Sequence, residues 1–219
     1  MDENKFAKTP WYKIVISFLI FSGLAFLFTK LAEEVMEAET LSFDTAVLNA
    51  IHQIANPTLD RLFIFITSLA GTIFIGLFTV GLALAFYLRK EIYNSVYILL
   101  TLGGTLVLNL ALKLFFKRVR PDLWSLLVVE KSYSFPSGHA MISLALALTL
   151  IVLAFNSRAR WPAIIAGLIY VLSIGFSRLY LGVHYPTDIL GGWIMSAVWI
   201  FLATRFMFLN TAFRIDTLT

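Results

Sequence analysis

The chain contains no cysteine among its 219 residues. A disulfide framework, a thiolate metal site and a cysteine nucleophile are therefore excluded. Charged residues are also scarce, because Asp, Glu, Lys and Arg make up 14% of the sequence, against roughly 25% in an average soluble domain. So few charges cannot cover a water-facing surface, which excludes an ordinary soluble globular protein.

Apolar residues make up 59% of the chain, and its mean hydropathy is +0.85. A helix needs about 20 apolar residues to cross a bilayer. We predict an all-α, polytopic membrane protein in which residues 1–219 form a single domain of six transmembrane helices. The predicted spans are 11–29, 62–88, 92–112, 139–155, 161–176 and 189–204.

Basic residues in short loops mark the cytoplasmic side of a membrane protein. They occur before the first predicted span, after the second, the fourth and the sixth, at Lys5, Lys8, Lys13, Arg89, Lys90, Arg158, Arg160, Arg205 and Arg214. We therefore predict a multi-pass protein of the cell membrane with cytoplasmic termini. The net charge of +4 fits this anchoring, and we expect no nucleic acid partner.

The segment between the first two predicted spans repeats apolar residues at helical spacing. The pattern runs through Phe43, Ala46, Val47, Ala50, Ile51 and Ile54 before Asn56 and Pro57 end it. It predicts an exterior amphipathic helix over residues 43–55. This helix lies either on the membrane surface or across the ends of the bundle.

The loop between the third and fourth predicted spans is basic, although the parity of the spans places it outside. Lys113, Lys117 and Arg120 are spaced i, i+4 and i+7, so they form one cationic stripe if the third span continues for two more turns. Pro121 would then end the helix. The alternative is that these side chains anchor a helix end at the membrane surface.

A second polar group stands at the start of the fourth predicted span. Ser137 can cap the helix, Gly138 allows a ligand to approach the first free amides, and His139 follows one residue later. This arrangement is typical of an anion site, because free N–H groups and the positive end of the helix dipole face the ligand. The alternative is an ordinary helix start with an incidental histidine.

A third polar group precedes the sixth predicted span and contains Arg178, His184, Pro186 and Asp188. Pro186 suits a first helical turn, and Asp188 can reach back four residues to fix the tautomer of His184. A histidine held in this way is a good nucleophile or base. The alternative is an interfacial polar pair without a substrate.

Together the three groups supply cations, an anion cradle and two histidines, as phosphoryl transfer requires. Zinc is a competing interpretation of two histidines and an aspartate, but no HExxH motif is present and the surrounding cations would repel a metal ion. A lipid transporter is the non-enzyme alternative. It would need ionisable residues near the bilayer midplane, where the predicted spans have almost none.

The three groups resemble the membrane branch of the type 2 phosphatidic acid phosphatase superfamily. Its pattern is a lysine, six residues and Arg-Pro, then Pro-Ser-Gly-His, then Ser-Arg, five residues, His, three residues and Asp. The chain matches at Lys113, Arg120, Pro121, Pro136, Ser137, Gly138, His139, Ser177, Arg178, His184 and Asp188. Within the superfamily it resembles bacterial lipid phosphatases of the phosphatidylglycerophosphatase B type.

The resemblance implies that His184 attacks phosphorus and forms a phosphohistidine, that Asp188 orients it, and that His139 protonates the departing oxygen. It implies phosphate binding by Lys113, Arg120, Ser137, Gly138 and Arg178. No metal or other cofactor is implied. The expected substrate is a lipid phosphate at the outer leaflet of the lipid bilayer, first phosphatidylglycerophosphate and alternatively undecaprenyl diphosphate. A lipid phosphotransferase would share every motif.

Overall fold

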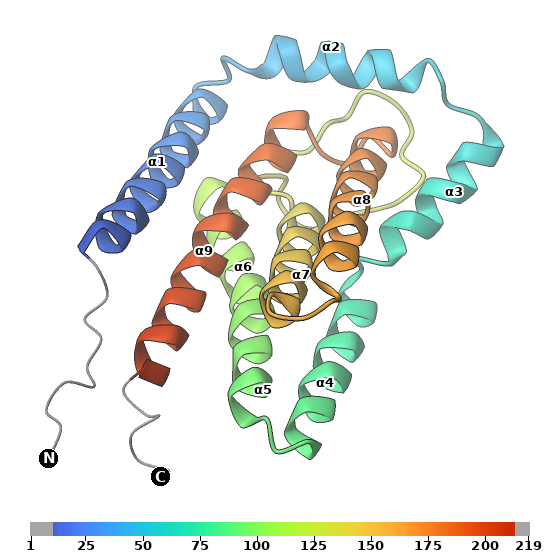
Figure 1. Ribbon diagram of the computed structural model, residues 1–219. Coiled ribbons are helices and arrows are strands. Elements are labelled where there is room, and N and C mark those ends of the chain that lie inside the picture. The colour runs from blue at the N-terminus through green and yellow to red at the C-terminus, as the bar shows by residue number, and fades with distance from the viewer. Residues whose placement is uncertain (1–10, 213–219) are drawn as a thin grey trace, which may run out of the picture.

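The structure, a computed structural model, describes residues 11–212, and all regular elements in that range are helices (Figure 1). The elements are α1 (Trp11–Met36), α2 (Leu41–His52), α3 (Pro57–Ser68), α4 (Thr72–Leu88), α5 (Ile92–Ile98), the π-helix η1 (Leu99–Gly103), α6 (Gly104–Phe116), α7 (Gly138–Ala154), α8 (Arg160–Tyr180) and α9 (Pro186–Ala212). This confirms the predicted all-α class.

Five segments of the described chain are long and apolar enough to cross a membrane. They are Ile14–Met36, Pro57–Leu88, Ile92–Phe116, Arg160–Tyr180 and Pro186–Met207. Large apolar side chains such as Phe18, Ile73 and Leu77 are exposed on the outside of these helices. Apolar surface of this extent needs lipid rather than water around it, so the chain is a membrane protein.

The core of the bundle surrounds α7, which corresponds to the predicted span 139–155. This helix is apolar but 17 residues long, shorter than the other five segments. It packs against α6, α8 and α9, while α1 packs along α9 (Figure 1). Its buried residues, among them Met141, Ile142 and Ala145, lie on more than one side of the helix. Apolar character all round is typical of a helix enclosed by other helices.

The predicted span 62–88 is divided into α3 and α4. The chain turns at Leu69 and Ala70, and Gly71 takes an extended conformation as the N-cap of α4. A break inside a membrane leaves backbone groups that need partners. The hydroxyl of Tyr170 on α8 supplies one by donating to the carbonyl oxygen of Leu69 at 2.8 Å. The break also brings Ala70 and Thr72 to the cavity described below.

The third apolar segment is continuous but contains the π-helix between α5 and α6. Within it, the carbonyl oxygen of Thr101 accepts a hydrogen bond from the Trp199 indole of α9 at 3.1 Å. Gly104 makes room for this ring, because a Cβ atom there would lie 2.2 Å from it. The π-turn and the glycine together let α9 pack closely against this segment.

The amphipathic helix expected over residues 43–55 is α2, which begins at Leu41 and ends at His52. It lies across one end of the bundle, over the ends of α8 and α9 (Figure 1). Its fully buried side chains are Asp44 and Leu48, whereas Phe43 of the apolar stripe is 56% exposed. The helix therefore turns a carboxylate inward. Its exterior location stays a prediction.

Candidate active site

The three predicted polar groups meet at the end of the bundle that α2 covers. The backbone N–H of Ser137, which precedes α7, donates to the carbonyl oxygen of Asp188 at 3.0 Å. Arg120, in the loop that follows α6, donates through Nη1 to the carbonyl oxygen of Val183 at 2.6 Å. These two bonds join segments that are far apart in the sequence.

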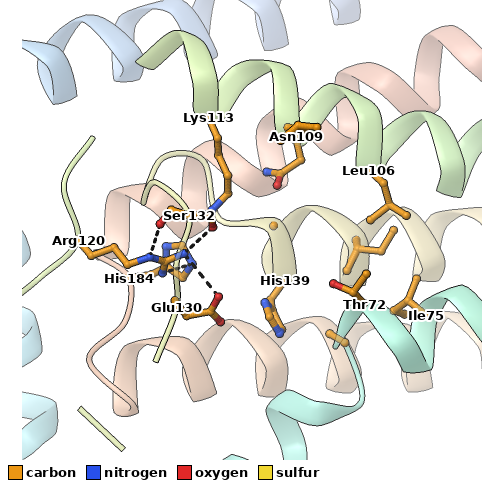
Figure 2. A pocket seen from close by; sticks show the side chains of 14 residues that line it. Thr72, Ile75, Leu106, Asn109, Lys113, Arg120, Glu130, Ser132, His139 and His184 are labelled. Carbon is orange, nitrogen blue, oxygen red and sulfur yellow. Dashed lines mark hydrogen bonds and ion pairs between the residues drawn. The ribbon is translucent and has the colours of Figure 1, made fainter. Parts of the chain in front are cut away.

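A cavity of about 230 Å³ lies where these segments meet. Its lining has two parts (Figure 2). The polar part includes Lys113, Arg120, Glu130, His139 and His184, and the opposite part includes Ala70, Thr72, Ile75, Leu106, Leu110 and Ile142. The cavity thus combines a charged end with a mostly apolar end formed by α4, α6 and α7.

His184 is buried at the charged end. Its Nε2 atom lies 3.0 Å from Nη1 of Arg120, and a guanidinium group can only donate, so Nε2 carries the lone pair. The proton is then on Nδ1, which lies 3.3 Å from both Oδ2 of Asp188 and Oγ of Ser134. Burial, together with the charges of Arg120 and other nearby cations, holds the pKa of His184 well below its usual value. The imidazole is therefore neutral at pH 7.

Asp188 is fully buried in the first turn of α9 and accepts hydrogen bonds on both oxygens. Oδ2 accepts from the hydroxyl of Ser134 at 2.5 Å and from the backbone N–H of Tyr185 at 2.9 Å. Oδ1 accepts from Nη1 of Arg118 at 2.6 Å. A carboxylate with these partners is fixed in orientation, and its Oδ2 atom lies beside Nδ1 of His184.

Lys113 and Arg120 are held by the same stretch of the loop between α6 and α7. The ammonium group of Lys113 donates to the Ser132 hydroxyl at 3.1 Å and to the carbonyl oxygen of Tyr133. Arg120 donates through Nε to the carbonyl oxygen of Ser132 at 2.8 Å. Both cations are directed toward the cavity (Figure 2).

Arg178, near the end of α8, is 1% exposed. It forms an ion pair through Nη2 with Glu130, and Nη1 donates to the Thr67 hydroxyl at 2.8 Å. The other carboxylate oxygen of Glu130 lies 3.8 Å from Nη2 of Arg120. Within the part of the chain that the structure describes, Nε of Arg178 is buried without a hydrogen-bond partner. Glu130 therefore lies against two of the predicted phosphate-binding residues, Arg120 and Arg178.

The start of α7 has the predicted capped geometry. The Ser137 hydroxyl oxygen accepts a hydrogen bond from the backbone N–H of Ala140 at 3.4 Å. A side chain at Gly138 would collide with Asn109, because a Cβ atom there would lie 2.8 Å from its Oδ1. His139 follows and lines the cavity (Figure 2).

The expected cationic stripe of Lys113, Lys117 and Arg120 is wrong. The helix α6 ends at Phe116 because Lys117 takes the left-handed conformation, with φ of 49°, and its backbone N–H bonds to the carbonyl oxygen of Lys113 at 3.0 Å. Lys117 is exposed as a result. The chain then leaves the helix, and Arg120 reaches the cavity from the loop.

The described residues, 11–212, contain no group of three or more His, Cys, Asp or Glu side chains that could hold a metal ion. The zinc interpretation needed such a group around the two histidines. Nε2 of His184 instead lies 3.0 Å from Nη1 of Arg120.

Comparison with known proteins identifies the family. Residues 94–212 match the family model described as the PAP2 superfamily. The chain belongs to this family. This PAP2 protein is 34% identical over 190 residues to phosphatidylglycerophosphatase B of Bacillus subtilis, covering 84% of this chain and 93% of the relative. It is also 32% identical over 169 residues to undecaprenyl-diphosphatase BcrC of the same organism, covering 73% of this chain and 82% of the relative.

The fold agrees as well. The crystal structure of a transmembrane PAP2-type phosphatidylglycerolphosphate phosphatase from Bacillus subtilis matches with a TM-score of 0.78 and 31% identity, covering 85% of this chain and 94% of that one. The family expected from the motifs is confirmed, and so is the functional class of a membrane phosphatase.

Several residues of the site were not among those predicted. Asp44, Arg118 and Glu130 belong to none of the three predicted motifs, and Ser134 lies just before the Pro-Ser-Gly-His motif. The hydrogen bond between Arg118 and Asp44 joins positions 74 residues apart, so no local pattern could have indicated it.

Proposed function

We propose that this PAP2 protein is a metal-independent lipid phosphatase that hydrolyses a lipid phosphate at the outer leaflet through a phosphohistidine on His184. The observation that carries this proposal is the two-part cavity. Its charged end fits a phosphoryl group beside two histidines, and its apolar end fits the part of a lipid next to the phosphate.

In the first step, Nε2 of His184 attacks phosphorus, and the bond between phosphorus and the lipid oxygen breaks. The lone pair on Nε2 and the hydrogen bond from Nδ1 toward Asp188 support this role. His139 is protonated once the negative charge of the bound phosphate offsets the surrounding cations, and it gives this proton to the departing oxygen. Asp188 stabilises the positive charge that develops on His184.

The phosphoryl oxygens are bound by Lys113, Arg120 and Arg178, with the Ser137 hydroxyl and the Gly138 amide. An entering phosphate takes the place of Glu130 beside the two guanidinium groups. The hydrogen bond that Arg120 donates to His184 then passes to a phosphoryl oxygen, which frees the lone pair for attack. These charge-assisted bonds compensate the negative charge of the transition state.

In the second step, water attacks the phosphohistidine, and neutral His139 accepts a proton from it. The bond between phosphorus and Nε2 breaks, its electron pair returns to nitrogen, and inorganic phosphate leaves. Each histidine regains its starting protonation state, so the cycle needs no metal ion or other cofactor.

Phosphatidylglycerophosphate is the proposed first substrate, and undecaprenyl diphosphate the second. The relatives named for these two substrates support both. Exposed Leu106 and Leu110 on α6 border the apolar end of the cavity, so a lipid can enter between α4 and α6 without leaving the bilayer. Methylenes that stay in lipid gain little on binding, so selectivity depends mainly on the headgroup.

We further propose six spans, with α7 as the fourth, cytoplasmic termini and an exterior site. The loops with exposed Arg89, Lys90 and Arg158 then lie in the cytoplasm, as basic short loops do.

Because the chain has no cysteine, single introduced cysteines report this orientation. A cysteine at Leu127 should react with an impermeant maleimide in intact cells, and one at Asn156 only after permeabilisation. The reverse pattern would contradict the orientation.

The function is tested by phosphate release from defined lipids with protein reconstituted in bilayers. Phosphatidylglycerophosphate, phosphatidate, undecaprenyl diphosphate and a water-soluble phosphomonoester are compared at matched local concentration, each with and without EDTA. We expect the lipid phosphates to be cleaved faster than the soluble ester, and EDTA to have no effect.

Three outcomes would contradict the proposal. Equal cleavage of the soluble ester would indicate a soluble-substrate phosphatase. Activity lost with EDTA and restored by zinc or magnesium would indicate a metal enzyme. Transfer of the phosphoryl group to a second lipid without release of phosphate would indicate a phosphotransferase.

A further inference from the structure

A carboxylate of α2 lies inside the polar network behind the cavity. Asp44 is fully buried although its helix lies on the end of the bundle. Its Oδ1 atom accepts from the backbone N–H of Thr187 at 3.1 Å. Its Oδ2 atom accepts from the Thr187 hydroxyl at 2.7 Å and from Nη2 of Arg118 at 2.7 Å. A buried charge with this many bonds occupies one position.

Arg118 connects this carboxylate to the predicted site. One nitrogen of its guanidinium group binds Asp44, and the other, Nη1, donates to Oδ1 of Asp188 at 2.6 Å and to the Thr187 hydroxyl at 2.8 Å. The face of the group lies 4.3 Å from the centre of the Tyr185 ring. Because a guanidinium is planar and rigid, fixing one side of it also fixes the other.

Neither Asp44 nor Arg118 lines the cavity, so neither touches a substrate there. Their route to the reaction passes through Asp188, whose second oxygen lies beside Nδ1 of His184. We propose that Asp44 and Arg118 are positioning residues that hold the Asp188 carboxylate in register with His184, which gives α2 a part in catalysis. This inference rests on the proposed function, since it takes His184 as the nucleophile.

The alternative is that Asp44 only fastens α2 to the bundle. The two roles differ in their electrostatic effect on His184. The charged and titratable groups around this imidazole are Arg118 and Arg120 of the loop between α6 and α7, Lys113 of α6, His139 of α7, Arg178 of α8 and Asp188 of α9. Neutralising Asp44 removes one of the carboxylates that compensate Arg118, so the net positive charge near the imidazole increases and the pKa of His184 falls. Neutralising Arg118 leaves Asp44 and Asp188 with one less cation and raises that pKa.

The experiment measures kcat and KM against pH for Asp44→Asn, Arg118→Gln and the double variant, with phosphatidylglycerophosphate as substrate. The controls are Asp122→Asn and Lys131→Gln, which make the same charge changes at exposed positions of the loop between α6 and α7. The midpoint of the acid limb of kcat/KM reports the protonation of His184 in the free enzyme. Using one substrate throughout cancels the ionisation of the substrate itself.

We expect Asp44→Asn to move this midpoint down and Arg118→Gln to move it up, each by about half a unit to one unit. The double variant should return close to the wild-type midpoint. kcat should fall about 10- to 100-fold in the single variants, as for other groups that orient a catalytic side chain, with KM little changed. Arg118→Lys should keep the wild-type midpoint but have a lower kcat, because lysine retains the positive charge but cannot bind Asp44 and Asp188 through two separate nitrogens.

A midpoint does not depend on how much protein is active, so partial misfolding of a variant does not obscure the result. Midpoints that stay at the wild-type value, or that move in the same direction in both single variants, would overturn the inference and leave Asp44 as an anchor of α2. The proposed function fails separately, if the wild type releases no phosphate or His184→Asn keeps its turnover.

Discussion

The cations of the candidate site, at one end of the helical bundle, and the cations in the turns at the other end are in opposite environments. At the end covered by α2, Lys113 is 6% exposed and Arg178 is 1% exposed, and each is bonded to several partners. The turns after α4 and α7 lie toward the other end (Figure 1). They carry Arg89, Lys90 and Arg158, which are all exposed. The same residue types are therefore buried and hydrogen-bonded in the candidate site but exposed in the turns at the other end.

The difference follows from the cost of removing a charge from water. An exposed cation beside a membrane costs little and influences the direction of insertion. A buried cation costs several kcal/mol unless partners compensate it, and such pairs seldom stabilise a fold. Buried cations around a neutral histidine are better explained by binding of an anion than by stability.

The largest expected effect is at His184. His184→Ala should abolish phosphate release from lipid phosphates and from an activated aryl phosphate, because every substrate needs the nucleophile. His52→Ala is the matched control, since His52 stacks on Trp124 at 4.0 Å and does not line the cavity. Residual turnover of His184→Ala above about a thousandth of the wild-type rate would argue against a phosphohistidine.

Replacement of His139 should have a large effect that depends on the substrate. A general acid contributes about 10²- to 10⁴-fold when the leaving oxygen is basic, and little when it is not. His139→Ala should therefore lose far more activity on a lipid phosphate than on an aryl phosphate. Comparable losses on both would contradict its role as the acid.

The two ends are compared directly by the same substitution at Arg178 and Arg158. Arg178→Gln leaves Glu130 without its buried partner, so we expect a loss of about 3–5 kcal/mol of stability as well as a loss of activity. Arg158→Gln should change both by little, since the side chain is exposed. Thermal unfolding in detergent and phosphate release measure the two effects. Equal responses would remove the distinction between the ends.

The smallest expected effect is a gain in anion affinity on removal of the Glu130 charge. Glu130 pairs with Arg178 and lies 3.8 Å from Arg120, so an entering anion has to displace it. Glu130→Gln should lower the inhibition constant of orthovanadate by about tenfold, or 1.4 kcal/mol. Asp122→Asn, at an exposed carboxylate of the same loop, should leave it unchanged. Weaker inhibition of Glu130→Gln would show that Glu130 supports anion binding instead.

Much of the geometry of the candidate site could be predicted because it depends on local spacing. Asp188 follows His184 by four residues at the start of a helix, and Ser137 caps α7 from the position where a cap is expected. The apolar segments were equally clear, since the bilayer requires about 20 residues of one character. The error at Lys117 arose where a left-handed residue ended α6, which periodicity does not reveal.

By itself, the sequence determined the membrane environment, the helical class and the motif residues, because each depends on composition or on spacing within a few turns. Tertiary structure alone decided the break between α3 and α4, the ion pair of Glu130 with Arg178, and the link from Asp44 to Asp188. Glu130 and Arg178 are 48 residues apart, and Asp44 and Thr187 are 143 apart. Contacts at such separations form only when the helices pack. A buried charge is costly unless it is paired, and its partner can come from any segment that the fold brings close.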